Sequence, residues 1–141
     1  MRNRQCHGFT LIETLIVVVI LAITATLAWP SYLEQVRKTR RSEGMGALVE
    51  LAGRMEHYYT DQGTYAGATL GAATTNIFPS ITARGHYTLR IDSQSSLGFS
   101  ISAIPTRSAG QHLDHCNTFI LDSLGNRKLL GNTLPFKQCW R

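Results

Sequence analysis

A single acidic residue lies inside a long apolar segment near the start of the chain. Residues 9–29 read FTLIETLIVVVILAITATLAW, and Glu13 is the only charged side chain among them. As an α-helix this segment is about 30 Å long, roughly the thickness of the hydrocarbon core of a bilayer. An unpaired carboxylate in such a helix costs on the order of 3 kcal/mol. We therefore expect the segment to enter a membrane and Glu13 to have a partner that offsets this cost.

Four kinds of N-terminal element contain an apolar segment of this type. A secretory signal removed after its apolar core does not fit, because the core is long and ends at Trp29-Pro30 without a small-residue cleavage site. A lipoprotein signal needs a cysteine after the core, whereas Cys6 precedes it. A plain transmembrane anchor fits the length but leaves Glu13 unexplained. Cleavage after Gly8 would leave the apolar helix, with its acid, on the mature chain.

Basic residues flank the apolar segment, and the chain has a formal net charge of +5. Two arginines precede the segment, and four basic residues follow it: Arg37, Lys38, Arg40 and Arg41. This 37–41 basic segment has two interpretations. It binds lipid headgroups or DNA phosphates, or it is a solvated helix face that pairs with acidic residues of neighbouring subunits. We prefer the second interpretation.

The late cysteines bear on the compartment of the protein. Cys116 and Cys139 belong to no C-x-x-C pair, so zinc is not expected. A disulfide between them would stabilise the fold by roughly 3 kcal/mol and would require an oxidising compartment. The positive-inside rule points the other way, because more basic residues follow the apolar segment than precede it. We adopt export of the C-terminal part.

The remainder of the chain predicts a small α+β unit. Residues 31–59 have helical periodicity, with an apolar stripe at Leu48, Leu51, Met55 and Tyr58, and are expected to continue the apolar helix. Pro30 is expected to kink or locally melt that helix. Four strand-like runs follow at residues 86–92, 98–104, 117–122 and 127–130. Their short connections favour an antiparallel sheet backed by the helix.

No enzymatic function is predicted. His112-x-x-His115-Cys116 has no acidic third ligand nearby, and the sequence contains neither a P-loop, nor a dinucleotide fingerprint, nor a nucleophile-and-base pattern. We expect no metal and no cofactor.

Residues 8–32, GFTLIETLIVVVILAITATLAWPSY, resemble the class III signal of type IV pilins and their pseudopilin relatives. Four later stretches are similar to PilE-type minor pilins: MEHYYTDQGTYA, FSISAIP, C-x-T-x-x-L-D-x-x-G from Cys116, and the terminal Cys139-Trp140. The resemblance implies the type IV pilin fold, in which a long N-terminal helix, its first half transmembrane, packs on a small antiparallel sheet.

The resemblance also implies a processing route. Residues 1–8 would be a leader that a prepilin peptidase removes by cutting between Gly8 and Phe9, after which Phe9 is N-methylated. Residues 9–30 would form the transmembrane and polymerisation half-helix, and residues 31–141 the periplasmic domain. Glu13 would face the Phe9 amine of a neighbouring subunit and set the axial register of the filament, since either charge alone in low dielectric is heavily penalised.

The function that the resemblance implies is that of a minor pilin, which primes assembly of a type IV pilus or is built into it for adhesion and twitching motility. The partners implied are the prepilin peptidase, the major pilin and other minor pilins, the inner-membrane assembly platform, inner-membrane lipid and a tip adhesin. The protein would lie in the inner membrane before assembly and in the extracellular pilus afterwards. The Cys116/Cys139 pair would bracket a C-terminal loop used in subunit contacts or binding.

Two alternative functions remain. In the first, the chain would be a DNA-receptor pilin for natural transformation, in which basic residues of the domain bind phosphates. Alternatively, it is a type II secretion pseudopilin, against which the Cys116/Cys139 pair counts.

Overall fold

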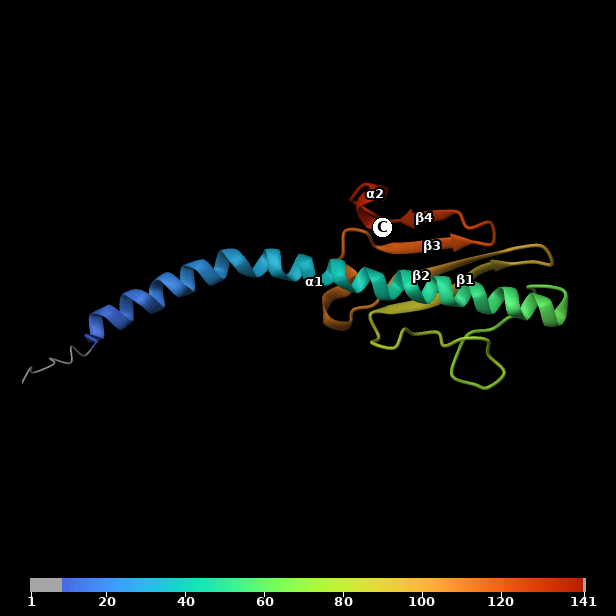
Figure 1. The fold of residues 1–141 in the computed structure, drawn as a ribbon, viewed down its shortest axis with the longest axis horizontal. Helices are drawn as coiled ribbons and strands as arrows, with labels where there is room; N and C mark the ends of the chain where they lie inside the picture. The colour runs from blue at the N-terminus through green and yellow to red at the C-terminus, as the bar shows by residue number, and fades with distance from the viewer. Residues whose placement is uncertain (1–8, 141) are drawn as a thin grey trace, which may run out of the picture. The chain divides into compact units, whose positions relative to one another are not determined.

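The computed structural model describes residues 9–140, so the predicted leader, including Gly8, lies outside the described residues. The chain divides into two compact units, residues 1–35 and 36–141. The first described element, α1 (Leu11–Gln62), contributes to both units. It is followed by β1 (Tyr87–Gln94), β2 (Phe99–Pro105), the 3-10 helix η1 (Ser108–Leu113), β3 (Thr118–Asp122), β4 (Arg127–Leu130) and the short α2 (Phe136–Cys139) (Figure 1).

The N-terminal unit presents an uncovered apolar helix surface. The side chains of the apolar segment are exposed, and this part of α1 is long and apolar enough to cross a membrane. Pro30 lies inside α1, and the helix continues through it without a break, so the local melting that Pro30 was expected to cause does not occur. A bend at Pro30 stays a prediction.

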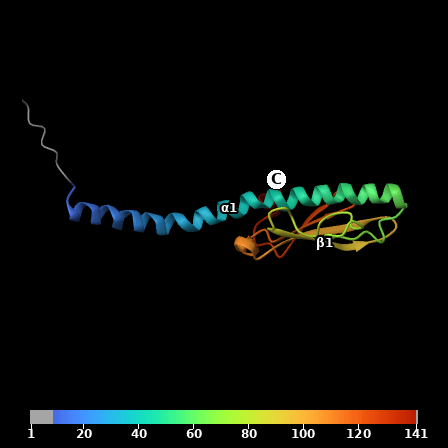
Figure 2. The same ribbon diagram turned by 90° about the horizontal axis from the view of Figure 1, so that it is seen from below.

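The C-terminal unit contains a four-stranded antiparallel sheet in the order β1-β2-β3-β4, as the sequence predicted. One face of the sheet is covered by the part of α1 that belongs to this unit (Figure 2). The bounds of β4 are those predicted. The other strand bounds differ by one or two residues: β1 extends to Gln94 because a bulge between Ile91 and Ser93 keeps its end paired with β2, and Gly98 belongs to the turn that Ser95 closes.

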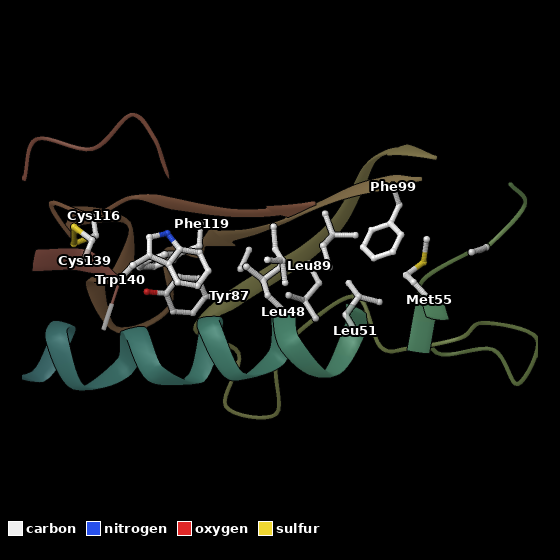
Figure 3. Packing of buried hydrophobic residues seen from close by; sticks show 14 of the residues in the cluster. Leu48, Leu51, Met55, Tyr87, Leu89, Phe99, Cys116, Phe119, Cys139 and Trp140 are labelled. Atoms are coloured by element: carbon white, nitrogen blue, oxygen red, sulfur yellow. A yellow bond between two sulfur atoms is a disulfide. The ribbon is translucent and has the colours of Figure 1, made fainter. Parts of the chain in front are cut away.

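The core lies between α1 and the sheet (Figure 3). From the predicted stripe, Leu48, Leu51 and Met55 are fully buried, and Tyr58 is half-buried. The sheet contributes inward-facing residues at alternate positions: Tyr87, Leu89, Phe99, Ile101, Ala103, Phe119 and Leu121. α1 ends at Gln62 rather than at residue 59, and Gly63 then takes a left-handed φ of 69° as a C-terminal cap.

The buried stripe of α1 also extends further toward the N-terminus than the sequence predicted, to Gly44 and Arg41. A Cβ atom on Gly44 would lie 3.0 Å from the Tyr87 ring, so the absence of a side chain allows this ring to lie against the helix. Arg41 is buried as well, although arginine is seldom buried unless it is paired.

Candidate functional site

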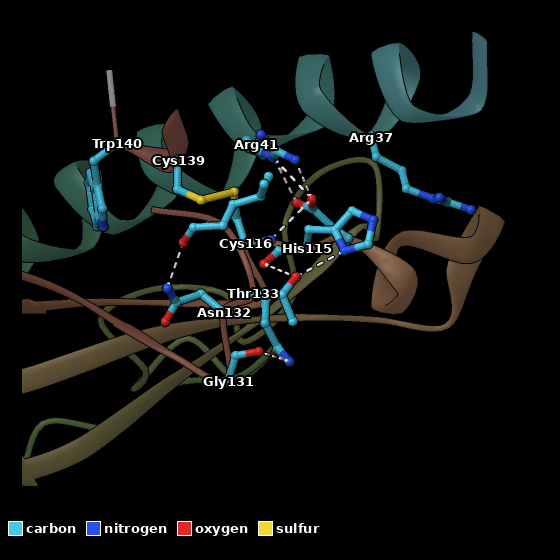
Figure 4. Close-up of a disulfide and its surroundings, with 12 residues drawn as sticks. Arg37, Arg41, His115, Cys116, Gly131, Asn132, Thr133, Cys139 and Trp140 are labelled. Carbon is cyan, nitrogen blue, oxygen red and sulfur yellow. Dashed lines mark hydrogen bonds and ion pairs between the residues drawn. A yellow bond between two sulfur atoms is a disulfide. The ribbon is translucent and has the colours of Figure 1, made fainter. Parts of the chain in front are cut away.

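A disulfide and a buried ion pair together organise one end of the C-terminal unit. Cys116, just before β3, is joined to Cys139 in α2 (Figure 4). Two residues before Cys116, Asp114 accepts hydrogen bonds from Arg41 Nε at 2.9 and 3.0 Å and from Arg41 Nη2 at 2.5 Å. Asp114 Oδ1 also accepts a hydrogen bond from the backbone N–H of Cys116. The ion pair therefore connects α1 to the segment that carries the disulfide.

Gln111 and Tyr87 surround this ion pair. The Gln111 amide donates to the Tyr87 hydroxyl at 3.0 Å and to the Arg37 carbonyl at 3.3 Å. Burial, together with the nearby Asp114 charge, raises the pKa of Tyr87 far above its ordinary value. The hydroxyl therefore stays protonated, and the buried polar groups join η1, β1 and α1.

The prediction that the whole 37–41 basic segment is a solvated surface is wrong for Arg41. Its side chain is 4% exposed and its charge is neutralised by Asp114, whose side chain is fully buried. Arg40 is half-buried, and its guanidinium donates to the Ala109 carbonyl in η1 at 3.0 Å. Lys38 is exposed, and Arg37 is half-buried. Arg41 thus has a structural role within the domain.

The structure brings Arg40 together with two arginines from other segments, and we call Arg40, Arg84 and Arg107 the arginine cluster. Arg40 and Arg84 line a hollow of about 360 Å³ between α1 and the segment before β1. Arg107 follows β2, where Thr106 donates from its backbone N–H to His86 and from its hydroxyl to Gly85, the residue after Arg84. Arg84 and Arg107 are both exposed.

Glu43 is the acidic residue at this hollow, and its carboxylate is already engaged. Its two oxygens accept from the backbone N–H of Arg84 at 3.1 Å and contact His86 Nδ1 at 2.5 Å. Burial raises the pKa of Glu43, but hydrogen bonds from Thr82, His86 and the Arg84 backbone outweigh burial and hold this pKa below its ordinary value. The carboxylate is therefore charged at neutral pH and is bound within the fold.

A second group of cations, which we call the C-terminal basic group, lies beyond β3: Arg127, Lys128 and Lys137. All three side chains are exposed. The Arg127 guanidinium carbon lies 5.2 Å from the centroid of the Trp140 ring, and the indole N–H of Trp140 donates to the Lys128 carbonyl at 3.2 Å. Within this group, Arg127 lies at the ring of a buried tryptophan that directly follows the disulfide.

The N-terminal residues singled out by the sequence lie in the other compact unit. Phe9 is 82% exposed, and Glu13 is at the first turn of α1, where its backbone N–H contacts the Thr10 hydroxyl. The carboxylate of Glu13 is outside the domain core, and its role in register stays a prediction.

Two family models match the chain. The model described as "Type IV minor pilin ComP, DNA uptake sequence receptor" matches residues 30–120, which is more than half of the chain, and the prokaryotic N-terminal methylation motif matches residues 3–29. The chain belongs to the ComP family of type IV minor pilins. The predicted membership of the type IV pilin family and the α+β fold are thereby confirmed, as is the prediction that this pilin is not an enzyme.

Individual relatives include a fimbrial protein and type II secretion proteins. The minor pilin is 37% identical over 70 residues to fimbrial protein EcpC of Eikenella corrodens, covering 48% of this chain and 46% of that protein. It is 29% identical over 87 residues to type II secretion system core protein G of Klebsiella michiganensis, covering 62% and 61%. The chain thus spans about half the length of the curated relatives it matches.

A solved structure supports the fold of this minor pilin. The non-core minor pilin PilV of Neisseria meningitidis superposes with a TM-score of 0.56 at 20% identity, covering 72% of this chain and 94% of that one. At this identity the likeness concerns the fold alone.

Sequence reasoning missed most of the exposed cations. Arg84, Arg107 and the C-terminal basic group are dispersed along the chain, and the segments that carry Arg84 and Arg107 meet only through the pairing of β1 with β2. The one available signal was the pair Arg127-Lys128 at the start of the predicted fourth strand, shortly before Cys139-Trp140.

Breaking the buried ion pair is expected to unfold the domain readily. Asp114→Asn leaves a buried guanidinium without a counter-charge, which costs about 3–5 kcal/mol. The free energy of unfolding, measured on the purified full chain in detergent by denaturant titration, should fall by this amount. Asp61→Asn is the matched control, because its side chain is 57% exposed and its ion pair with His57 lies at the surface. Equal stabilities of the two variants would contradict the role given to Asp114.

Proposed function

We propose that this minor pilin is a DNA receptor, which binds duplex DNA at the cell surface for uptake in natural transformation. The observation that carries the proposal is the match of residues 30–120 to the family described as a DNA uptake sequence receptor. This matched segment includes the arginine cluster and most of the sheet. The DNA-receptor alternative thereby gains more support than the assembly function preferred from the sequence.

The distribution of charge supports DNA as the ligand. From residue 42 onward the chain has eight Lys and Arg against seven Asp and Glu, which is almost neutral. Several of the acids are nevertheless bound within the fold: Asp114 by Arg41, Glu43 by His86, and Asp122 by the backbone N–H groups of Leu124 and Asn126. Arg84, Arg107 and the C-terminal basic group are exposed, and exposed cations bind phosphates through counterion release.

The remaining expectations fit around this function. Prepilin peptidase would remove residues 1–8 and methylate Phe9, after which the apolar half-helix, residues 9–30, enters the filament with other pilins. The domain from residue 31 would be periplasmic before assembly and extracellular afterwards. Because some relatives are named as type II secretion proteins, a pseudopilin function is a second candidate for this chain. The family matched over residues 30–120 is a different one, that of the DNA uptake sequence receptor.

DNA binding is expected to depend on exposed arginines and on salt. Fluorescence anisotropy of a short labelled duplex, titrated with the full chain in neutral detergent, should show binding at low salt. The slope of log K against log salt should flatten by roughly 2 in the double variant Arg84→Gln and Arg107→Gln, because each lost phosphate contact contributes about 0.9. Arg54→Gln removes an exposed arginine of α1 outside the cluster and should leave the slope closer to that of the wild type. Absence of binding at low salt would refute the DNA-receptor function.

Incorporation into filaments is expected to require Glu13. Glu13→Val should leave the protein inserted in the membrane and processed, but depleted from sheared pili, because the Phe9 amine of the neighbouring subunit would lack its counter-charge. Immunoblots of the membrane and sheared fractions measure this. Thr14→Val is the adjacent control and should assemble. Normal recovery of the Glu13 variant in pili would remove the register role.

A further inference from the structure

We propose that Arg127 reads a guanine base edge in the major groove of duplex DNA, with the β3–β4 hairpin as the element that enters the groove. The inference rests on the DNA-receptor function and adds to it the residue that makes binding depend on sequence. Three features of the hairpin carry it: the support of the guanidinium, its unengaged donors, and the shape of the element.

The Arg127 guanidinium is held against a fixed aromatic surface. Trp140 is 7% exposed, packs edge-on against the buried Phe119 at 5.3 Å between ring centroids, and directly follows the disulfide-bonded Cys139. Its indole N–H is hydrogen-bonded to the Lys128 carbonyl in β4. Stacking on such a platform reduces the conformational entropy that an arginine loses on binding.

Among residues 9–140, no hydrogen bond or ion pair engages the donors of this arginine. In the part of the chain that the structure describes, Arg41 is paired with Asp114 and Arg90 with Asp92, whereas no carboxylate is paired with Arg127. The N–H groups of a guanidinium lie in one plane as a fixed fork. That fork matches the O6 and N7 acceptors of guanine in a bidentate contact, whereas a lysine ammonium is a point charge without this fixed geometry.

The hairpin has the form of a groove-reading element. β4 is the edge strand of the sheet and is paired on one side only, with β3. The turn between them is rigid, because Asp122 accepts hydrogen bonds from the backbone N–H of Leu124 and Asn126 and from the Asn126 side chain, and Gly125 takes a φ of 78°. Because β3 is also paired with β2, the hairpin is the edge of a four-stranded sheet, and β4 with its turn is the part that can enter the major groove, which is about 12 Å wide.

Arg127 and Lys128 are neighbours on β4, and their side chains point to opposite faces of the sheet. Successive side chains of a strand point to opposite faces, so Lys128 points away from the face that carries Arg127 and Leu129. Lys128 pairs in register with Ile120 on the outer face of the sheet. We assign Lys128 to a phosphate and Arg127 to a base, which makes Lys128 a control of the same charge on the same strand.

The test is selection from a pool of random-sequence duplexes by the full chain in detergent, followed by sequencing of the retained DNA. The wild type should enrich a motif that contains guanine. Arg127→Gln and Arg127→Lys should lose discrimination at one position of that motif by roughly 10- to 100-fold, the effect of one bidentate base contact. Lys128→Gln should keep the motif, bind more weakly, and flatten the salt slope by about 0.9. Melting curves establish that each variant is folded, and Arg127→Lys retains the charge.

Three results would overturn the assignment. If the Arg127 variants enrich the same motif with the same discrimination, Arg127 does not read a base. If Lys128→Gln loses the same position, the effect is one of charge and not of readout. If the wild type binds DNA but enriches no motif, the base contact is absent while the DNA-receptor function stands. Failure of the wild type to retain any DNA at low salt would instead refute that function itself.

Discussion

The buried contact between Arg41 and Asp114 is the interaction on which the C-terminal unit depends. Taking two charges out of water is costly, and the pair is tolerated because the guanidinium makes several hydrogen bonds to the carboxylate, which also accepts from Cys116. A series of contacts then leads from α1 through Asp114 and the disulfide to Trp140, over whose ring the Arg127 guanidinium lies. The position of an exposed arginine in the proposed DNA interface is thereby linked to a salt bridge in the interior.

The same arrangement explains how an almost neutral domain can present a basic surface. Several carboxylates have partners within the domain: Asp114 pairs with Arg41, Glu43 contacts His86, and Asp122 accepts hydrogen bonds from backbone donors of the β3–β4 turn. Cations at the segment ends, by contrast, reach solvent. Net charge therefore underestimates the attraction of such a domain for phosphates. Its exposed cations come from separate segments: Arg84 and Arg107 flank the paired ends of β1 and β2, and Arg127 begins the edge strand β4.

Local sequence patterns predicted the helix and strands well, but they could not predict contacts between residues far apart in the sequence. Leu48, Leu51 and Met55 have the spacing of a buried helix face, and β4 was predicted with its observed bounds. The partner of Arg41 could not be predicted, because Asp114 is 73 residues away in the sequence. In addition, a run of basic residues is typical of a solvated surface. The N-terminal motif could be recognised from the sequence because its residues are contiguous. The arginine cluster could not be predicted, because the segments that carry Arg40, Arg84 and Arg107 meet only after the chain has folded.

The central claim is that this minor pilin binds duplex DNA at the cell surface for uptake. The most direct measurement is uptake of labelled duplex DNA by cells from which the chain has been deleted, with pili counted in the same cells by electron microscopy. Our account predicts loss of DNA binding and uptake by the cells that still carry pili, both restored by the wild-type chain. Uptake at the wild-type level by piliated cells without the chain would contradict it.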